Sequence, residues 1–297
     1  MTEGTRPEHR QSRSVEEILT AKPASDGDGV RLLRVFGGGD LSRFDPFLML
    51  DEFGSAEAQD YIGGFPSHPH RGFETVTYML EGSMEHRDHM DNIGLLEPGD
   101  VQWMKAGSGV IHSEMPRQQQ GRMRGFQLWL NLPAAEKMTP ATYQDIPAAD
   151  IPRYPADKGA VKAIAGETAV NGAGVTGAVT GLSTDPVYLD IQLPASAGQK
   201  NNELRFRIKD GYTALVYVYD GKVAVGEESV SIAVQQLARL SRQGDVLVSG
   251  SDVRFLLIAG KPIGEPIVQY GPFVMNTREE VNLALREYRD GTLVSPR

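Results

Sequence analysis

The sequence predicts an all-β protein made of two antiparallel β-barrels, with one helix near the C-terminal end. Three observations predict it: short apolar segments separated by turn residues, similar patterns in the two halves of the chain, and a single segment with helical periodicity. Strands that recur every ~8–12 residues between such turns are typical of sandwiches and barrels. A chain of 297 residues is long enough for two compact domains of this kind.

Strand candidates are rich in β-branched and aromatic residues, and turns such as Pro98-Gly99-Asp100 separate them. In the first half they are residues 30–36, 47–53, 75–80, 101–104 and 126–131. In the second half they are residues 187–193, 213–219, 236–240 and 253–259. The regular alternation of strand and turn favours closed antiparallel sheets in both halves.

The two halves of the chain also resemble each other. Residues 78–82 (YMLEG) match residues 217–221 (YVYDG). Residues 96–103 (LEPGDVQW) match residues 240–248 (LSRQGDVLV), in the same order and at nearly the same spacing. Such a repeat indicates a duplicated barrel.

One segment near the C-terminus has the pattern of an amphipathic helix. Thr277 and Glu280 have the spacing of a capping box, apolar residues recur at helical spacing from Val281 to Tyr288, and Gly291 follows. We expect this helix to brace the second domain. The predicted organisation is a flexible tail over residues 1–14, an N-terminal domain over 15–137, a linker over 138–159, and a C-terminal domain with the helix over 160–297.

Composition excludes several classes of protein. The chain has no cysteine, which excludes disulfides, thiolate metal sites and a cysteine nucleophile. Its formal charge of -9 disfavours binding to nucleic acid, whose phosphates are also negative. The N-terminal residues lack the apolar segment of a signal peptide, and no apolar run reaches the ~18 residues of a membrane span. We therefore expect a cytoplasmic protein that contacts neither nucleic acid nor membrane directly.

Four residues in the first half have the spacing of metal ligands. His68 and His70 form an H-x-H pair, and His112 and Glu114 form an H-x-E pair. Side chains at i and i+2 of a strand point to the same side, so each pair can direct both side chains at one ion. Three imidazoles and one carboxylate suit several divalent transition metals. The alternative interpretation is that these are ordinary surface or core residues.

The remaining histidines and a nearby glutamate have weaker patterns. His86 and His89 are spaced at i and i+3, so on a strand they would face opposite sides, and we interpret them as surface residues or outer partners of the site. His9 lies in the tail and receives no role. Glu74 would share the face of the H-x-H pair on a regular strand. Because Gly72 is expected to interrupt that strand, we interpret Glu74 as an outer residue and not as a ligand.

Long motifs extend this pattern to a known family. HPHRGFET, EGSMEHRD, PGDVQWM and HSEMP lie within residues 65–116, FDPFLMLDEF precedes them, and QLWLNLP, EKMTPATYQ and GPFVMNTREE follow. On these motifs the chain resembles the pirin family of the cupin superfamily over about residues 30–288. The resemblance implies a bicupin of two jelly-roll barrels, the first holding one metal ion and the second none. The absence of histidine after residue 112 agrees with this implication.

The resemblance also implies a ligand set and an activity. The positions that match the family's metal ligands are His68, His70, His112 and Glu114, whereas the general cupin pattern would take its carboxylate from the position of Glu74. Some family members resemble quercetinases, which open a flavonol ring with dioxygen. Other members act as regulators. The metal is usually iron, and we expect Fe(II), with Ni, Mn, Cu, Co or Zn as alternatives.

The resulting hypothesis is a metal-dependent dioxygenase of quercetin 2,3-dioxygenase type, with a flavonol and O2 as substrates. Glu114 is the candidate catalytic base, because a carboxylate at the metal can accept the proton of the flavonol hydroxyl. The competing hypothesis is a regulatory metal-binding protein without enzymatic activity, whose partner is a transcription factor or a metabolic enzyme. In either case the family resemblance favours a monomer.

Overall fold

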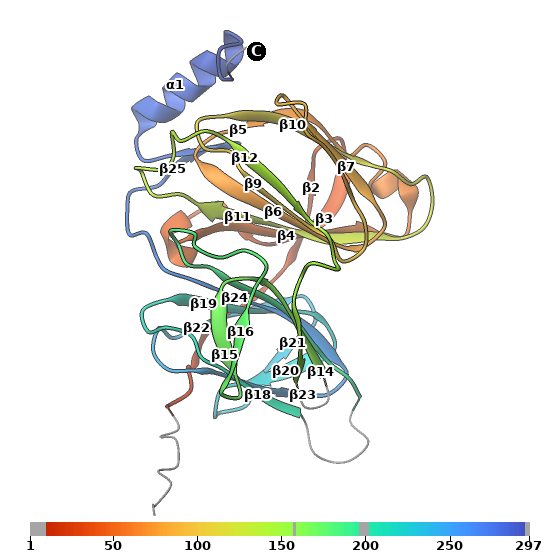
Figure 1. Cartoon of the computed structure of the whole chain (residues 1–297), viewed down its shortest axis with the longest axis vertical. Coiled ribbons are helices and arrows are strands. Elements are labelled where there is room, and N and C mark those ends of the chain that lie inside the picture. The colour runs from red at the N-terminus through yellow and green to blue at the C-terminus, as the bar shows by residue number, and fades with distance from the viewer. Residues whose placement is uncertain (1–9, 157–158, 196–201, 295–297) are drawn as a thin grey trace, which may run out of the picture. The chain divides into compact units, whose positions relative to one another are not determined.

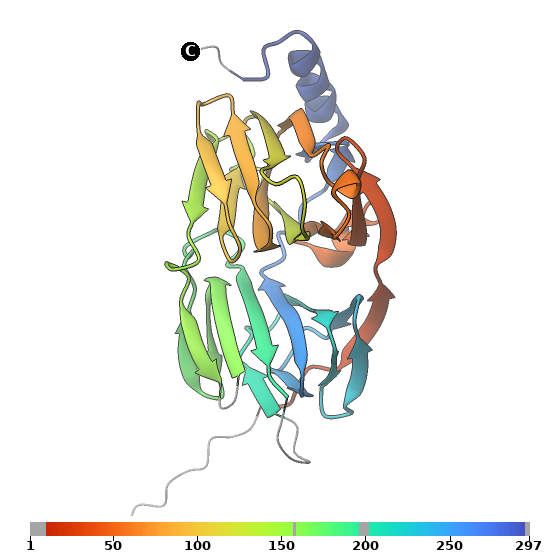
Figure 2. The same cartoon turned by 90° about the vertical axis from the view of Figure 1, so that its right-hand side faces the viewer.

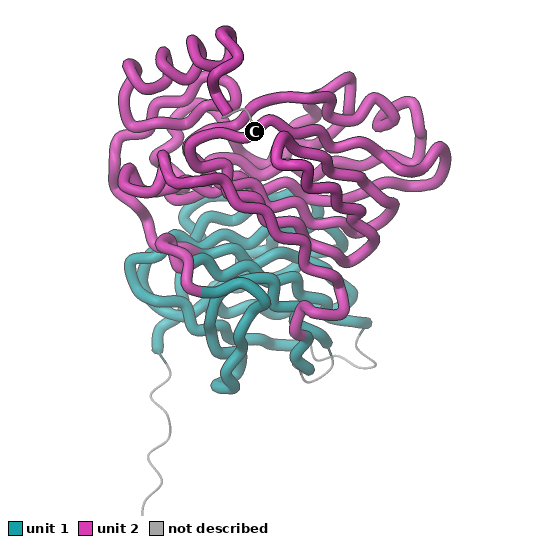
Figure 3. Tube along the Cα trace, turned by 45° about the horizontal axis from the view of Figure 1, so that its top comes forward, with its two compact units in different colours: residues 1–18, 153–180, 186–259 teal, residues 19–152, 181–185, 260–297 magenta. Residues whose placement is uncertain are grey.

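The computed structural model describes residues 10–156, 159–195 and 202–294, and β-strands dominate it (Figure 1). The all-β prediction is confirmed, since the described residues form twenty-six strands, two short 3-10 helices and one α-helix. The chain divides into two compact units (Figure 3). Unit 1 comprises residues 1–18, 153–180 and 186–259, and unit 2 comprises residues 19–152, 181–185 and 260–297. No helix in the described part of the chain has the length and apolar character needed to cross a membrane.

The barrel of unit 2 is built from two antiparallel sheets with apolar side chains packed between them. The seven-stranded sheet has the order β12-β9-β6-β11-β4-β3-β2, and the four-stranded sheet has the order β5-β10-β7-β8. The strands of the larger sheet are β2 (Lys22–Asp26), β3 (Val30–Gly37), β4 (Phe47–Ser55), β6 (Phe73–Glu81), β9 (Val101–Lys105), β11 (Met123–Asn131) and β12 (Thr142–Ile146). Those of the smaller sheet are β5 (Phe65–His70), β7 (Met84–Asp88), β8 (Ile93–Leu96) and β10 (Val110–Pro116). Buried Leu32, Phe53 and Met79 of the larger sheet pack in one cluster with Met84 and Leu96 of the smaller sheet.

Unit 1 has the same plan (Figures 1 and 2). Its seven-stranded sheet has the order β1-β22-β19-β24-β17-β14-β13, and its second sheet has the order β16-β15-β18-β23-β20-β21. The strands of the first are β1 (Val15–Thr20), β13 (Arg153–Ala156), β14 (Gly159–Ala165), β17 (Val187–Leu193), β19 (Thr213–Asp220), β22 (Gln236–Leu240) and β24 (Val253–Gly260). Those of the second are β15 (Glu167–Val170), β16 (Ala173–Thr176), β18 (Asn202–Phe206), β20 (Lys222–Val225), β21 (Val230–Ala233) and β23 (Val246–Gly250).

Topology supports the predicted duplication but corrects one of its two sequence matches. β6 and β19 both hold the third place in the order of the two large sheets, so the match between residues 78–82 and 217–221 joins equivalent strands. The second match joins the turn before β9 to the turn before β23, whereas the strand equivalent to β9 by sheet order is β22. The glycine-aspartate turn therefore recurs at two different points of the barrel, and this similarity does not reflect equivalent positions.

The N-terminal segment differs from the predicted flexible tail. Residues 1–9, including His9, lie outside the described residues, but residues 10–14 are ordered in unit 1. Arg13 is fully buried, and its guanidinium donates hydrogen bonds to four backbone carbonyls. The acceptors are those of Lys209, Tyr212, Ser241 and Gly244. Nothing in the neighbouring sequence indicates this order, because the acceptors lie about 200 residues away along the chain.

Two further boundaries differ from the prediction. The described part of residues 138–159 is not a free linker, because β12 pairs with β9 and β13 pairs with β14. The predicted helix α1 (Arg278–Arg289) is present with both halves of its Thr277–Glu280 capping box, but it lies in unit 2. It packs against β25 (Val268–Tyr270) and β26 (Phe273–Met275). The C-terminal segment thus completes the unit formed mainly by the first half of the chain.

Candidate metal centre

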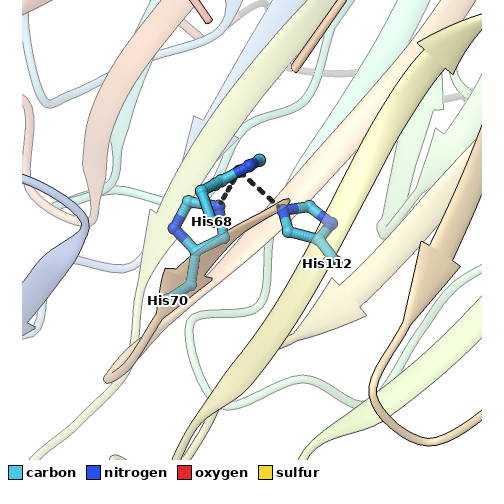
Figure 4. Close-up of side chains that lie close together, drawn as sticks. All are labelled: His68, His70 and His112. Carbon is cyan, nitrogen blue, oxygen red and sulfur yellow. Dashed lines mark hydrogen bonds between the residues drawn. The ribbon is translucent and has the colours of Figure 1, made fainter. Parts of the chain in front are cut away.

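Three histidines converge inside unit 2 (Figure 4). His68 and His70 come from β5 and His112 comes from the neighbouring antiparallel strand β10, where it lies opposite His68. The Nε2 atom of His68 is 2.9 Å from Nε2 of His70 and 2.9 Å from Nε2 of His112. The H-x-H pair and the first residue of the H-x-E pair are therefore brought together.

The spacing and protonation of these nitrogens fit a metal ion. Imidazole nitrogens that bind one ion at about 2.0–2.1 Å along perpendicular directions are about 3 Å apart. The Nδ1 atom of His68 lies 2.8 Å from the carbonyl oxygen of Pro66, which can only accept a hydrogen bond. A neutral His68 ring therefore carries its proton on Nδ1 and leaves Nε2 free to bind a metal.

Burial favours the same neutral form in the other two rings. His70 and His112 are almost inaccessible to solvent. Burial, followed by the neighbouring His68, lowers the pKa of His70 well below its usual value. Burial, followed by His70, His68 and His86, lowers the pKa of His112 in the same way. A neutral imidazole is the form that coordinates metals.

Glu114 is buried nearby, and two side chains donate hydrogen bonds to its carboxylate. Thr77 Oγ1 donates to its Oε1 at 3.0 Å, and Gln127 Nε2 donates to its Oε2 at 3.1 Å. The pairing of β10 with β5 shifts register between His112 and Glu114, and the carboxylate is not among the atoms that lie within 4.8 Å of one another. Spacing alone did not reveal Thr77 and Gln127, which come from β6 and β11 of the other sheet.

Glu74 faces away from the histidines. The chain leaves the small sheet after His70, passes through Gly72 with a φ of +89°, and enters the large sheet at Phe73. The Phe73 ring lies 5.1 Å from that of His70, so the odd-numbered residues of β6 face the cluster. Glu74 therefore lies on the opposite side of the strand. This agrees with the expected interruption at Gly72, but Glu74 is not an outer partner of the site.

The buried carboxyl of Glu74 predicts a pH-dependent stability. Burial raises the pKa of Glu74 to about 7, against 4.5 for the free side chain. The folded state therefore holds this proton more tightly, and its contribution to stability decreases as pH rises from about 4.5 to about 7. Glu74→Gln is expected to remove this loss and to stabilise the protein at pH 8 by up to about 3 kcal/mol. Urea unfolding of both proteins at pH 5 and pH 8 measures it, and a difference that does not change with pH would contradict the assignment.

A cavity of about 920 Å³ lies beside His68 and His70. Its apolar lining comes mainly from Leu48, Met49, Phe65 and Trp129. Gln127 joins this lining, so one side chain contacts both the cavity and Glu114. Apolar and polar groups contribute about equally to the lining, so the cavity offers both packing surface and hydrogen-bonding groups to a small organic molecule.

The charged and glycine-rich side of the cavity was not foreseen from the sequence. Arg34 lines it, and its guanidinium is held by Asp51 through two hydrogen bonds of 3.0 and 2.8 Å. The glycines at positions 37–39 also line the cavity, and all three have positive φ. Without side chains, this segment leaves its backbone accessible to a ligand.

His86 and His89, the second histidine pair of the sequence, lie in two different environments. His86 is fully buried, and its Nδ1 lies 3.3 Å from Nδ1 of His112. His89 is only partly buried, and its Nδ1 faces the backbone N–H of Ile111 at 3.4 Å. His86 is thus an outer partner of the cluster, as one of the two interpretations predicted, and the two rings do not share an ion.

The C-terminal segment supports the connection that follows the H-x-H pair. Arg71 forms a parallel bridge with Phe273, and its carbonyl accepts a hydrogen bond from Val274 N–H at 3.0 Å. The Arg71 guanidinium is buried and pairs with Glu287 of α1 at 2.6 Å. Its Nη2 also donates to the carbonyl of Leu293 at 3.2 Å. Residues near the end of the chain therefore hold the backbone that positions His68 and His70.

Comparisons with known proteins agree with this architecture. Two family models match the chain, "Pirin" over residues 29–130 and "Pirin C-terminal cupin domain" over residues 188–294. The chain is 56% identical over 284 residues to a Pseudomonas aeruginosa protein named "Putative quercetin 2,3-dioxygenase", covering 95% of this chain and 98% of the relative. It is 39% identical over 285 residues to the pirin of Homo sapiens, covering 94% of this chain and 93% of the relative. A crystal structure of quercetin 2,3-dioxygenase from Acinetobacter baumannii matches with a TM-score of 0.85 and 34% identity, covering 96% of this chain and 99% of the other.

Proposed function

Because the chain belongs to the pirin family, we propose that it is a metal-dependent dioxygenase that opens a flavonol ring with O2, as quercetin 2,3-dioxygenases do. The family resemblance indicated by the motifs is confirmed, and the fold is that of a bicupin. One observation carries the proposal. The Nε2 atom of His68 lies 2.9 Å from Nε2 of His70 and 2.9 Å from Nε2 of His112, beside a cavity of about 920 Å³ with both apolar and polar lining residues.

We assign His68, His70 and His112 as ligands of one divalent ion, with Glu114 as the fourth. The mixed nitrogen and oxygen donors suit Fe(II), our first choice, and also Ni, Mn, Co, Cu or Zn. Bound there, the ion would act as a Lewis acid and as a template for the substrate and O2. The cluster fits such an ion because both buried rings are neutral and His68 has a free Nε2.

The protein's own groups have separate roles in this proposal. Glu114 accepts the proton of the flavonol hydroxyl, which makes the ring electron-rich. Thr77 and Gln127 fix the orientation of its carboxylate, one on each oxygen. The aromatic walls Phe65 and Trp129 pack against the flat substrate and exclude water from its reacting face. Gln127 is placed to contact both Glu114 and the substrate.

The test is turnover of quercetin by purified protein loaded with iron in oxygenated buffer. We expect the flavonol absorption band to disappear, and Glu114→Gln to lower kcat by about 100-fold or more, as for loss of a general base. Glu74→Gln is the matched control, because the same change is made on the side of β6 that faces away from the site, and it should leave kcat unchanged. Full metal occupancy without turnover would count against a flavonol dioxygenase and favour a regulatory metal-binding protein.

A further inference from the structure

His112 has a second ring nitrogen that points away from the cluster. Its Nε2 faces His68, so Nδ1 lies on the other side of the ring, 3.3 Å from Nδ1 of His86. His86 lies on β7, the strand next to β10, where it is directly opposite Glu114. Because His86 is fully buried, no bulk water can take the place of this contact.

The contact between the two rings determines where their protons lie. A His112 ring with a bare Nε2 carries its proton on Nδ1, and this N–H can donate to Nδ1 of His86. His86 then has its own proton on Nε2. That atom lies 3.5 Å from Oδ2 of Asp88, whose side chain is also fully buried.

Asp88 is held in place by its own turn. Its Oδ1 accepts the backbone N–H groups of Met90 at 2.8 Å and Asn92 at 3.1 Å, and its Oδ2 accepts Nδ2 of Asn92 at 2.8 Å. Its carboxylate is therefore fixed beside His86, close to Nε2 but without a direct hydrogen bond to it. The ring of Tyr143, on β12, stacks on the His86 ring, with 4.5 Å between the two ring centroids.

We propose that His86 is a positioning residue of the metal centre, which together with Asp88 fixes His112 in the tautomer that offers Nε2 to the ion. This inference rests on the proposed metal site and adds a residue to it. A hydrogen-bond acceptor on the outer nitrogen of a ligand imidazole orients the ring and raises its basicity. Loss of such a partner weakens metal binding by about 10- to 100-fold.

Two substitutions separate the hydrogen bond from the bulk of the ring. His86→Leu fills part of the space without an acceptor, and we expect its metal affinity to fall by about 10- to 100-fold. In His86→Asn the side-chain oxygen can occupy the position of Nδ1 and accept from His112, so its affinity should stay close to that of wild type. His89→Leu is the control from the same hairpin and should behave as wild type.

Affinity is measured by competition of Fe(II) or Ni(II) against a chromogenic chelator, together with the thermal unfolding of each metal-free variant. An unchanged affinity in His86→Leu, or an equal loss in His86→Asn, would overturn the inference. Imidazole nitrogen NMR of metal-free wild-type protein provides a test without substitution, since it should show the proton of His112 on Nδ1. Wild-type protein that binds no metal would overturn the proposed site itself, which is a different outcome from failure of His86 alone.

Discussion

Replacing His70 with alanine is expected to lower metal affinity by about 100- to 1000-fold, since the roughly 10–16 kcal/mol of a four-ligand site is divided among its ligands. His70 is buried, and its Nε2 lies 2.9 Å from that of His68. Its loss leaves two imidazoles, and His86 cannot replace it because its ring lies behind His112. Calorimetric titration of metal-free protein with Fe(II) or Ni(II) measures the effect.

A pair of glutamate variants provides the control for this prediction. Glu114→Gln should also weaken binding, whereas Glu74→Gln should not, because Glu74 lies on the side of β6 away from the cluster. The comparison distinguishes the pirin arrangement from the general cupin arrangement, in which the carboxylate would come from the position of Glu74. Equal losses in the two variants would contradict our assignment of Glu114, and an unchanged affinity in His70→Ala would contradict the histidine cluster.

The sequence was most informative where structure depends on local spacing. Alternation within a strand placed His68 beside His70, and strand–turn alternation identified the all-β class. The capping box at Thr277 identified the start of α1 to the residue. All of these features are encoded within a few neighbouring residues, so one short segment is enough to recognise them.

Alternation failed where the chain changes sheet. Glu74 has the same parity as His70, but the backbone at Gly72 takes β6 into the other sheet and reverses the direction of its side chains. Thr77 and Gln127 were missed for the same reason. Their proximity to Glu114 depends on how two sheets face each other, and no spacing within a strand encodes that.

The domain boundaries were missed because both ends of the chain pair with distant segments. β1 lies beside β22 in unit 1, although its neighbours in sequence continue into unit 2. The C-terminal residues return to unit 2. There Phe273 forms a β-bridge with Arg71, and Glu287 forms an ion pair with the Arg71 guanidinium. A metal centre that appears to belong to the first half of the sequence thus depends on side chains near residue 290.

Lys137 is a buried ammonium that ties this C-terminal segment to the connection after His70. Its Nζ donates to the carbonyls of Gly72 at 2.7 Å and Val274 at 3.0 Å, and to Oδ1 of Asn131 at 2.6 Å. Three N–H groups meet three acceptors, so every donor of the ammonium is used. Burial lowers the pKa of Lys137 to about 8, which still leaves it mostly protonated at neutral pH.

Lys137→Met is expected to lower the free energy of unfolding of unit 2 by about 3–5 kcal/mol, because the change leaves three acceptors buried without a donor. It should also weaken metal binding, since the carbonyl of Gly72 no longer anchors the backbone that follows His70. Both tryptophans, Trp103 and Trp129, lie in unit 2, so their fluorescence during urea unfolding reports on this unit alone. Lys22→Met changes an exposed lysine of the same unit and should alter stability by less than about 0.5 kcal/mol. If the two variants were equally stable, Lys137 would only fill space, and the C-terminal segment would have to be held by Arg71 and Glu287.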